Sequence, residues 1–345
     1  MNINNSLRLP AEWEPISAVL LAWPHSNTDW AHMLDQVRSC YLDIIREISK
    51  RAKVILIGPE QPAEYSAGTI TENVFFVQMP TNDTWTRDYG PITMVDTDGR
   101  PTLLDFTFNG WGLKFAADKD NCATRVLVGK DVLSGKYANH LGFVLEGGGI
   151  ECDGKGTLLT TSQCLLSPNR NAEMTKEQIE QYLKDTFNLN RVLWLDHGAL
   201  EGDDTDSHID TLARFAPPGD VIFYSGCIEP EDSHYNELKE MREQLAQLRT
   251  ADGKPYHLME LPIPDPVFDP DDNIRIPATY ANFLFVNGAV LLPVYGQPMK
   301  DLMAKQMLEA ALPDFEIVPI DCSALIRQHG SLHCATMQLP LNVFN

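Results

Sequence analysis

Residues 149–161, GIECDGKGTLLTT, place two short strand-like runs on either side of a turn rich in glycine. This pattern predicts a β-hairpin, because glycine readily adopts the backbone conformations that tight turns require. Helical segments fall between further copies of the pattern, which suggests units repeated around an axis, as in a propeller whose blades also carry helices. An ordinary two-layer α+β domain would give similar local patterns and stays open. The further copies are ITMVDTDGRPTLLDF (92–106), LARFAPPGDVIFYS (212–225) and LFVNGAVLLPVYG (284–296).

Apolar residues at three- and four-residue spacing predict amphipathic helices between the hairpins. The first covers residues 29–50, with Thr28 as its N-cap. The second begins at Thr175, where Thr175 and Gln178 form the pattern of a capping box. Further elements are expected as helices near 231–248 and 299–311 and as strands within AVLLAWP (18–24), NVFFVQMP (73–80), RVLWLDH (191–197) and LHCATMQLP (332–340).

Length and charge limit the class of protein. The chain has 345 residues, 43% of them hydrophobic, and no linker interrupts it, so we expect a single domain over residues 1–345. Its net charge of −21 argues against nucleic acid or an anionic membrane as a partner. The same charge would concentrate a small cation near the protein, although solubility alone explains it equally well.

Cysteine usage and the N-terminus indicate the compartment. The seven cysteines contain no CxxC pair and no zinc-ligand spacing, so we expect no disulfide framework and no metal. The N-terminal segment MNINNSLRLPAEWEP has no basic stretch followed by an apolar run, and no apolar stretch reaches membrane-spanning length. We therefore expect a cytoplasmic protein, and we keep a homo-oligomer as an open alternative.

Five residues in glycine-, proline- or serine-containing stretches carry the candidate chemistry. Cys334 follows a histidine in HGSLHCATMQLP (329–340), and a thiol in such a turn is a plausible nucleophile. One imidazole and three carboxylates accompany it, which points to nucleophilic chemistry on a cationic substrate. These partners are Asp88 in WTRDYGP, Glu146 in LEGGGIECDG, and His208 with Asp210 in DDTDSHIDTLARF.

Each of these residues also has a simpler interpretation. Asp88 could pair with neighbouring Arg87, Glu146 could cap a turn, and His208 could be an ordinary hydrogen-bonded histidine. His208 and Asp210 are two residues apart in a strand-like stretch, which would place both side chains on one face. A free cysteine is usually a buried, inert side chain, and this is the role expected of Cys40, Cys122, Cys164 and Cys227.

The motifs and their order along the chain resemble those of the guanidine-modifying pentein superfamily, and within it those of the branch of agmatine deiminases and bacterial peptidylarginine deiminases. The resemblance covers nearly the whole chain and implies an α/β fold, a five-bladed pseudo-symmetric α/β propeller with its active site on the central axis. The motifs are PAEWEPISAVLLAWPH (10–25), WTRDYGP (85–91), FNGWG (108–112), EGGGIECDGKGTLLTTSQCLLSPNRN (146–171), SHID (207–210) and GSLHC (330–334).

The resemblance also implies a role for each candidate residue. Asp88 and Asp210 would hold a planar guanidinium by charge-assisted hydrogen bonds, which fixes its central carbon beside the thiol of Cys334. His208 would transfer protons to the departing ammonia and from the attacking water, and Glu146 would orient His208. Neither a metal nor an organic cofactor is implied.

Two further residues belong to the implied substrate site. Trp85 matches a family aromatic residue that packs on the substrate, and Asp204 matches an acidic position that would receive a distal amine. The chain departs from the agmatine deiminase pattern where Ser207 replaces the usual glycine before the histidine, and where HGSLHC replaces a more typical GGGNIHC. Both departures touch the rim of the implied site and bear on the identity of the substrate.

The implied activity is hydrolysis of agmatine to N-carbamoylputrescine and ammonia. A peptidylarginine or free arginine deiminase would use the same side chains, and an amidinotransferase would replace water by an amine. A Cys-His peptidase is disfavoured, because carboxylates beside the reacting carbon would repel a developing oxyanion. A non-catalytic binding propeller is the remaining alternative, and it predicts that replacing Cys334 changes no turnover.

Overall fold

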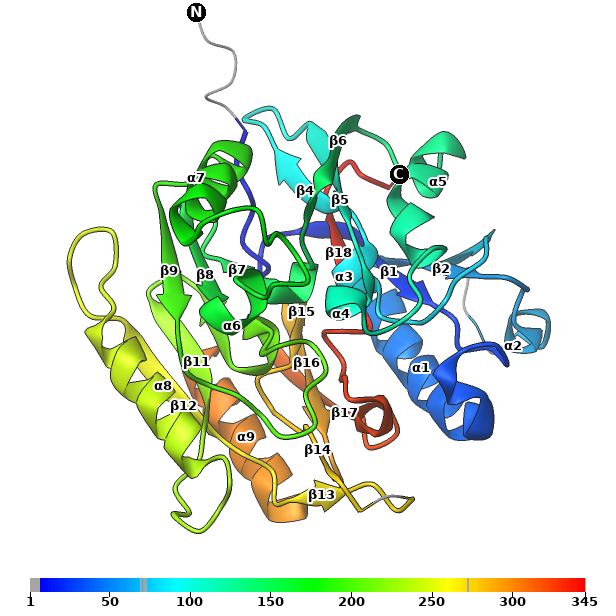
Figure 1. The fold of residues 1–345 in the computed structure, drawn as a ribbon. Helices are drawn as coiled ribbons and strands as arrows, with labels where there is room; N and C mark the ends of the chain where they lie inside the picture. Colours follow the sequence, from blue (N-terminus) through cyan, green and yellow to red (C-terminus); the bar gives the residue numbers. More distant parts are fainter. Residues whose placement is uncertain (1–6, 69, 71–72, 272, 345) are drawn as a thin grey trace, which may run out of the picture.

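The structure is a computed structural model that describes residues 7–68, 70, 73–271 and 273–344. Residues 1–6 of the N-terminal segment considered above lie outside these ranges. The fold is mixed α/β, with small sheets arranged side by side and the longer helices packed against them on the outside (Figure 1). No helix in the described ranges is long and apolar enough to cross a membrane.

One small unit recurs five times within the described residues. Two antiparallel strands are followed by a helix and by a third strand, which pairs in parallel with the second. The helix is needed because two parallel neighbours cannot be joined by a tight turn. Four of the units are continuous in sequence: β4 (Ile92–Val95), β5 (Pro101–Thr107), α5 (Ala123–Gly129) and β6 (Lys136–Val144); β7 (Ile150–Cys152), β8 (Thr157–Thr161), α7 (Lys176–Phe187) and β9 (Arg191–Leu195); β10 (Ala213–Ala216), β11 (Val221–Gly226), α8 (Tyr235–Gln247) and β12 (His257–Pro262); β15 (Leu284–Val286), β16 (Ala289–Val294), α9 (Pro298–Ala311) and β17 (Glu316–Asp321).

The remaining unit joins the two ends of the chain. The strand β1 (Ile16–Ala22) pairs in antiparallel with β18 (Met337–Pro340) and in parallel with β2 (Lys53–Gly58), which follows α1 (Leu34–Ser49). A further parallel strand, β3 (Val74–Gln78), extends this sheet. The other short elements lie partly within and partly between the units. They are α2 (Ala63–Ser66), α3 (Thr86–Tyr89), α4 (Gly110–Leu113), α6 (Ser162–Leu165) and the paired strands β13 (Val267–Phe268) and β14 (Arg275–Ile276).

The four predicted hairpins are confirmed by the strand pairing. Each predicted segment contains an antiparallel pair, with Ile92 opposite Leu104 and Ile150 opposite Thr160 in the first two. The turn between β15 and β16 consists of Asn287 and Gly288, whose φ angles are 36° and 84°. Both values lie in the left-handed region, where asparagine and glycine are tolerated best, so the turn follows directly from these two residue types.

The predicted helices are confirmed except for the first turn of the first one. Residues 29–32 form a 3-10 turn and α1 begins only at Leu34. Thr28 makes no side-chain capping bond and instead donates its hydroxyl to the carbonyl of His25, so its prediction as a helix N-cap was wrong. The interruption allows Trp30 to lie fully buried, with its indole N–H donating to Thr84 at 2.9 Å.

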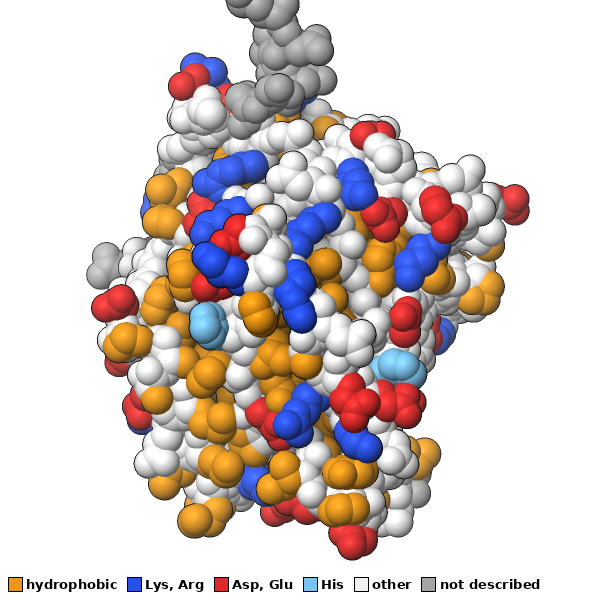
Figure 2. Space-filling view, turned by 90° about the vertical axis from the view of Figure 1, so that its left-hand side faces the viewer, with side chains coloured by type: hydrophobic (Ala, Val, Ile, Leu, Met, Phe, Trp, Pro, Cys, Tyr) orange, Lys and Arg blue, Asp and Glu red, His pale blue; other side chains and the backbone are white. Residues whose placement is uncertain are grey.

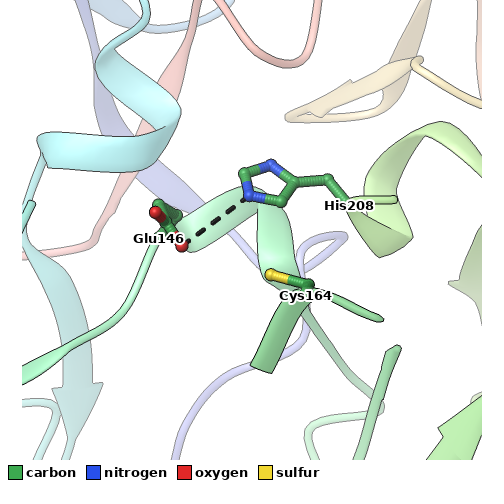
Figure 3. A group of neighbouring side chains, drawn as sticks. All are labelled: Glu146, Cys164 and His208. Atoms are coloured by element: carbon green, nitrogen blue, oxygen red, sulfur yellow. Dashed lines mark ion pairs between the residues drawn. The ribbon is translucent and has the colours of Figure 1, made fainter. Parts of the chain in front are cut away.

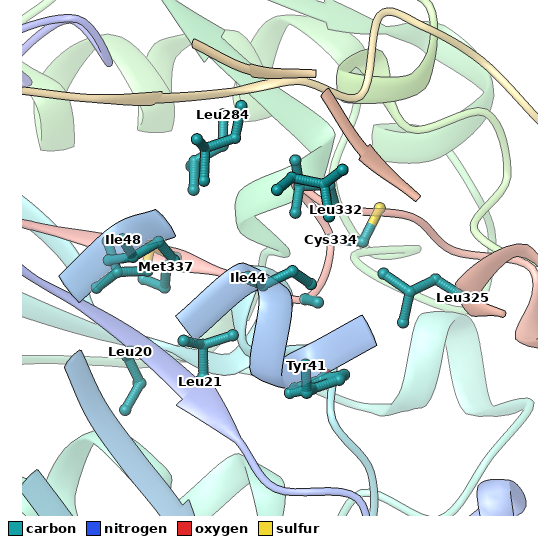
Figure 4. Packing of buried hydrophobic residues seen from close by; sticks show 14 of the residues in the cluster. Leu20, Leu21, Tyr41, Ile44, Ile48, Leu284, Leu325, Leu332, Cys334 and Met337 are labelled. Carbon is teal, nitrogen blue, oxygen red and sulfur yellow. The ribbon is translucent and has the colours of Figure 1, made fainter. Parts of the chain in front are cut away.

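The largest hydrophobic cluster includes α1 and the sheet of β1, β2 and β18, and it extends to the sheet of β15, β16 and β17 (Figure 4). Tyr41, Ile44 and Ile48 on α1 face the first of these sheets, and Met337 on β18 belongs to the same cluster. Cys334, three residues before β18, lies at the edge of the cluster. The core therefore holds in place the segment that carries the candidate nucleophile.

The capping box at the start of α7 can be tested by mutation. The Thr175 hydroxyl accepts the backbone N–H of Gln178, and the Gln178 side chain accepts the backbone N–H of Thr175 at 2.8 Å. Thr175→Ala should lower the free energy of unfolding by about 1 kcal/mol, measured by urea denaturation. Thr175→Ser keeps the hydroxyl and is the matched control; equal losses in both variants would contradict the capping role.

Candidate active site

The connections between successive units meet in one buried region. Each connection supplies at least one polar side chain to this region. A Cβ atom at Gly148 would lie within 3.2 Å of side-chain atoms of His208, Asp88 and Asp210. A side chain at position 148 is therefore excluded, which accounts for one glycine of the EGGG motif by close approach. The side chains come from α3 (Asp88), the end of β6 (Glu146), the segment before β10 (His208 and Asp210), the segment before β15 (Asn282) and the segment before β18 (Cys334).

The structure brings together all five residues predicted to be catalytic. Cys334 Sγ lies 3.6 Å from Asp210 Oδ2. The ring of His208 lies between two acids, with Nδ1 3.7 Å from Asp88 Oδ1 and Nε2 3.8 Å from Glu146 Oε2. All five side chains are at most 5% exposed, so their charges interact with little screening by water.

The prediction that His208 and Asp210 lie in a strand was wrong. Asp206 and Ser207 have φ angles of 64° and 63°, and residues 209–211 form a 3-10 turn. The side chains of Asp203 and Thr205 hold this bend, because they accept the backbone N–H groups of Ser207 and His208. A positive φ favours glycine, which gives a physical reason for the glycine that the family usually has at position 207.

Asp88 is held by two donors rather than by its neighbour Arg87. Trp111 donates its indole N–H to Oδ2 at 2.9 Å, and Gly148 donates its backbone N–H to Oδ1 at 2.9 Å. Arg87 donates instead to the carbonyl of His333 and to Gln338. Burial raises the pKa of Asp88 and outweighs the opposing effect of His208.

Glu146 does not cap a turn but forms a fully buried ion pair. Arg170 Nε donates to both oxygens of Glu146, at 2.8 and 3.1 Å, and Arg170 also contacts Asp206 at 2.6 Å. Burial by itself would raise the pKa of Glu146, but His208 and Arg170 lower it overall. Arg170 lies in the SPNRN stretch of the longest motif, yet nothing in its local pattern marked it as a partner of Glu146.

The imidazole of His208 is held in the charged form by its surroundings. Burial would lower the pKa of His208, but Asp88, Cys164 and Glu146 raise it well above its ordinary value. Neither ring nitrogen has a hydrogen-bond partner among the described residues. Protons at both nitrogens are therefore free to be given to a bound molecule.

Cys164 is buried in a hydrophobic cluster, as expected, and its sulfur lies beside this histidine. Its sulfur, Glu146 and His208 each offer one atom that could ligate a metal, and these atoms lie within 4.8 Å of one another (Figure 3). Arg170 already supplies a cation to this carboxylate. Of the other cysteines assigned to the core, Cys40 and Cys227 are buried as expected, whereas Cys122 is only half-buried.

Asp210 and Cys334 are held by residues that the motifs had not marked. His333 Nδ1 lies 2.7 Å from Asp210 Oδ2, and Asn282 donates its side-chain N–H to Cys334 Sγ at 3.3 Å. Burial, together with the charges of Asp210 and Asp88, raises the pKa of the Cys334 thiol well above its ordinary value. Burial would also raise the pKa of Asp210, but His333 lowers it overall.

A pocket of about 110 Å³ opens onto Cys334 and Asp88. Trp85 and Trp111 give it aromatic walls, and Asp204 lies at its half-exposed rim, 3.8 Å from His329. Among the described residues, no lysine or arginine lines it. The remaining lining residues are Asp29, Asp83, Phe115, Thr205, Gln328 and Gly330.

Charge is distributed unevenly over the rest of the surface. On the face shown in Figure 2, lysine and arginine side chains gather in the upper half of the view and hydrophobic side chains in the lower half. The net charge of −21 is therefore not a uniform acidic coat. The acidic character that bears on a ligand is that of the pocket itself.

The fold and the site together define a class: repeated ββαβ units whose connections bring a thiol, an imidazole and several carboxylates into one acidic, aromatic pocket. Comparison with known proteins agrees. The model of the Porphyromonas-type peptidyl-arginine deiminase family matches residues 8–340. The chain belongs to this family.

Relatives with assigned names cover almost the whole chain. It is 32% identical over 360 residues to the agmatine deiminase of Pseudomonas syringae pv. tomato, covering 97% of this chain and 96% of the relative. A substrate-bound agmatine deiminase structure from C. jejuni is 39% identical, with a TM-score of 0.89 and 96% of each chain covered. A Porphyromonas gingivalis structure, provisionally named an arginine deiminase, is 44% identical with a TM-score of 0.91, covering 98% of this chain and all of that one.

The pKa of His208 predicts a pH-dependent stability. A histidine whose pKa is raised on folding stabilises the folded state fully below its unfolded pKa of about 6.5, and this contribution is lost as the pH rises through the folded pKa. The free energy of unfolding should therefore fall between pH 6 and 8 in the wild type, and fall less in His208→Gln. Urea denaturation across this range measures both slopes, with exposed His257→Gln as control. Equal slopes in all three proteins would contradict the assignment.

Proposed function

We propose that this chain is an agmatine deiminase, a hydrolase that cleaves a C–N bond of the guanidinium of agmatine and releases N-carbamoylputrescine and ammonia. The observation that carries the proposal is the Cys334 thiol, which lies 3.6 Å from Asp210 and lines an acidic pocket together with Asp88. A planar cation held by both carboxylates would present its central carbon to the sulfur.

In the proposed mechanism, the substrate activates its own nucleophile. Burial and the negative charges of Asp210 and Asp88 raise the pKa of the Cys334 thiol. A bound guanidinium neutralises these carboxylates and lowers the pKa of the thiol, which then loses its proton to water and becomes a thiolate. Cys334 then attacks the guanidinium carbon, His208 gives a proton to the departing ammonia, and a covalent thiouronium remains.

Water completes the reaction. His208, now neutral, takes a proton from the attacking water, and collapse of the second tetrahedral intermediate frees the thiol and the ureido product. Glu146, fixed by Arg170, holds the charge of His208 and orients its ring. This sequence explains why the imidazole lies among acids that raise its pKa.

The pocket favours agmatine over arginine. Asp204, Asp29 and Asp83 line it and could receive a distal amine, and no lysine or arginine of the described residues is there to bind an α-carboxylate. Trp85 supplies an aromatic wall for the methylene chain and its cation. The alternative is deimination of peptidylarginine or free arginine. It is supported by the description of the family and by the name of the Porphyromonas gingivalis structure.

The same proposal includes the architecture. The five ββαβ units are taken as blades of a pseudo-symmetric α/β propeller, with the connections that meet at Gly148 on its axis. Residues 1–345 then form a single catalytic domain. Cytoplasmic location and a homo-oligomeric state stay predictions. The alternative from another class of protein is a non-catalytic binding propeller, and measurable turnover of a guanidine would exclude it.

The purified protein should release ammonia from agmatine faster than from arginine or an arginine-containing peptide, with the ureido product identified by mass. Cys334→Ala should lose at least about a thousandfold in turnover while still binding agmatine, because it removes only the nucleophile. Asp88→Asn or Asp210→Asn should weaken both binding and turnover. Wild-type turnover in Cys334→Ala would overturn the mechanism. A preference for arginine or for the peptide would keep the chemistry but change the assigned substrate.

Asp204→Asn should raise the KM for agmatine about three- to tenfold with little change in kcat, as expected for a half-exposed ion pair. The KM for a guanidine without a distal amine, such as butylguanidine, should stay unchanged. Exposed Asp314→Asn is the matched control. An equal rise for both substrates would show that Asp204 does not contact the amine.

A further inference from the structure

His333, immediately before Cys334, connects Asp210 to a second buried acid. Its Nδ1 lies 2.7 Å from Asp210 Oδ2 and its Nε2 lies 2.7 Å from Glu12 Oε2, and the side chain is 1% exposed. Both ring nitrogens therefore face a carboxylate oxygen at hydrogen-bond distance. The contact with Asp210 is satisfied by an N–H at Nδ1. Nε2 also lies 3.1 Å from Arg214 Nη2, which is a donor, so this nitrogen can accept from Arg214 or donate to Glu12.

The two oxygens of Asp210 are in different environments. Oδ2 accepts from His333 and lies beside the Cys334 thiol. Oδ1 is buried and has no hydrogen-bond partner among the described residues. An unpaired buried carboxylate oxygen is costly, so the fold must hold Asp210 in this orientation by its other contacts.

Glu12 is itself fixed on the far side of His333. Arg214 donates to Glu12 Oε2, and the backbone N–H of Phe285 donates to Oε1 at 3.1 Å. Glu12 and His333 line a second cavity, of about 350 Å³, which lies behind the site and does not share Cys334 with the substrate pocket. His333 and Cys334 thus face different cavities although they are neighbours in sequence.

We propose that His333 is a positioning residue that turns Asp210 so that its free Oδ1 meets the guanidinium, and that Glu12 fixes His333 in this role. The inference rests on the proposed function, because it takes Asp210 as a ligand of the substrate cation. The alternative is a buried ion pair that contributes to stability alone.

Two substitutions distinguish the roles of the two ring nitrogens of His333. His333→Asn places an amide N–H near the position of Nδ1 and keeps the donor to Asp210, whereas His333→Gln places it near Nε2 and keeps only the donor to Glu12. In His333→Gln, kcat/KM for agmatine should fall about 10- to 100-fold, mostly through KM, as expected for loss of a hydrogen bond to a charged group. His333→Asn should stay within about threefold of the wild type.

The same difference should appear in binding. In a Cys334→Ala background, the Kd for agmatine by calorimetry should rise by a similar factor in His333→Gln but not in His333→Asn. Glu14→Gln is the matched control, since Glu14 lines the same rear cavity but pairs with Arg8. Equal effects of the Gln and Asn variants would overturn the proposal. Where His333→Gln does not fold, an unchanged Kd in Glu12→Gln would do the same.

A readout that needs no turnover separates this inference from the proposed function. Cys334 can be alkylated by cationic 2-chloroacetamidine and by neutral 2-chloroacetamide, each forming an S–C bond and releasing chloride. Asp210 should favour the cation, so the ratio of the two rates should drop in His333→Gln and hold in His333→Asn. A wild type that leaves agmatine intact would contradict the proposed function, whereas an unchanged ratio in His333→Gln would contradict the positioning role.

Discussion

The pairing of β18 with β1 is the constraint on which the site depends. Strand β18 pairs with β1, so one sheet contains two segments that lie more than 300 residues apart in the sequence. Backbone hydrogen bonds hold β18, and Met337 packs with α1 in the largest core cluster. Because Cys334 lies only three residues before this strand, the position of the thiol is fixed by sheet pairing and core packing rather than by a mobile loop.

The site concentrates charge in a region from which water is largely excluded. Asp88, Glu146 and Asp210 are each compensated differently: by an indole and a backbone N–H, by a buried arginine, and by a buried histidine. Removing any one partner would leave a buried charge unpaired, which typically costs several kcal/mol. The motifs thus contain two kinds of residue, those that would meet the substrate and those that keep the first kind charged and oriented.

Much of the fold could be predicted from the local sequence, because hairpins and amphipathic helices depend on turn residues and on the short-range spacing of apolar residues. Asn287–Gly288 and the capping box at Thr175 specify their turns by residue type alone. The break before α1 could not be predicted in this way, since it depends on where Trp30 is buried. The bend at residues 206–207 was misread as a strand, because its cause is side-chain bonding by Asp203 and Thr205 rather than hydrophobic alternation.

The candidate site shows the same division. The five residues that meet in the structure were selected by motif and chemistry, but their partners Arg170, Trp111, Asn282 and His333 were not, although three of them lie within the quoted motifs. Glu146 and Arg170 are 24 residues apart, and Asp210 and His333 are 123 apart. Such pairs are specified by how the units pack together, which a single sequence without homologues does not display.

The place of Cys334 in the chain has a consequence for biosynthesis. Three connections that carry the carboxylates and the histidine of the site precede it, and the strand β18 that fixes it follows the other described strands. During translation the earlier units can pack while the reactive sulfur is still absent, so the carboxylates and His208 can be in place before the nucleophile joins them. A ribosome-bound intermediate that lacks the segment with Cys334 would have no assembled thiol to react with cellular electrophiles or guanidines.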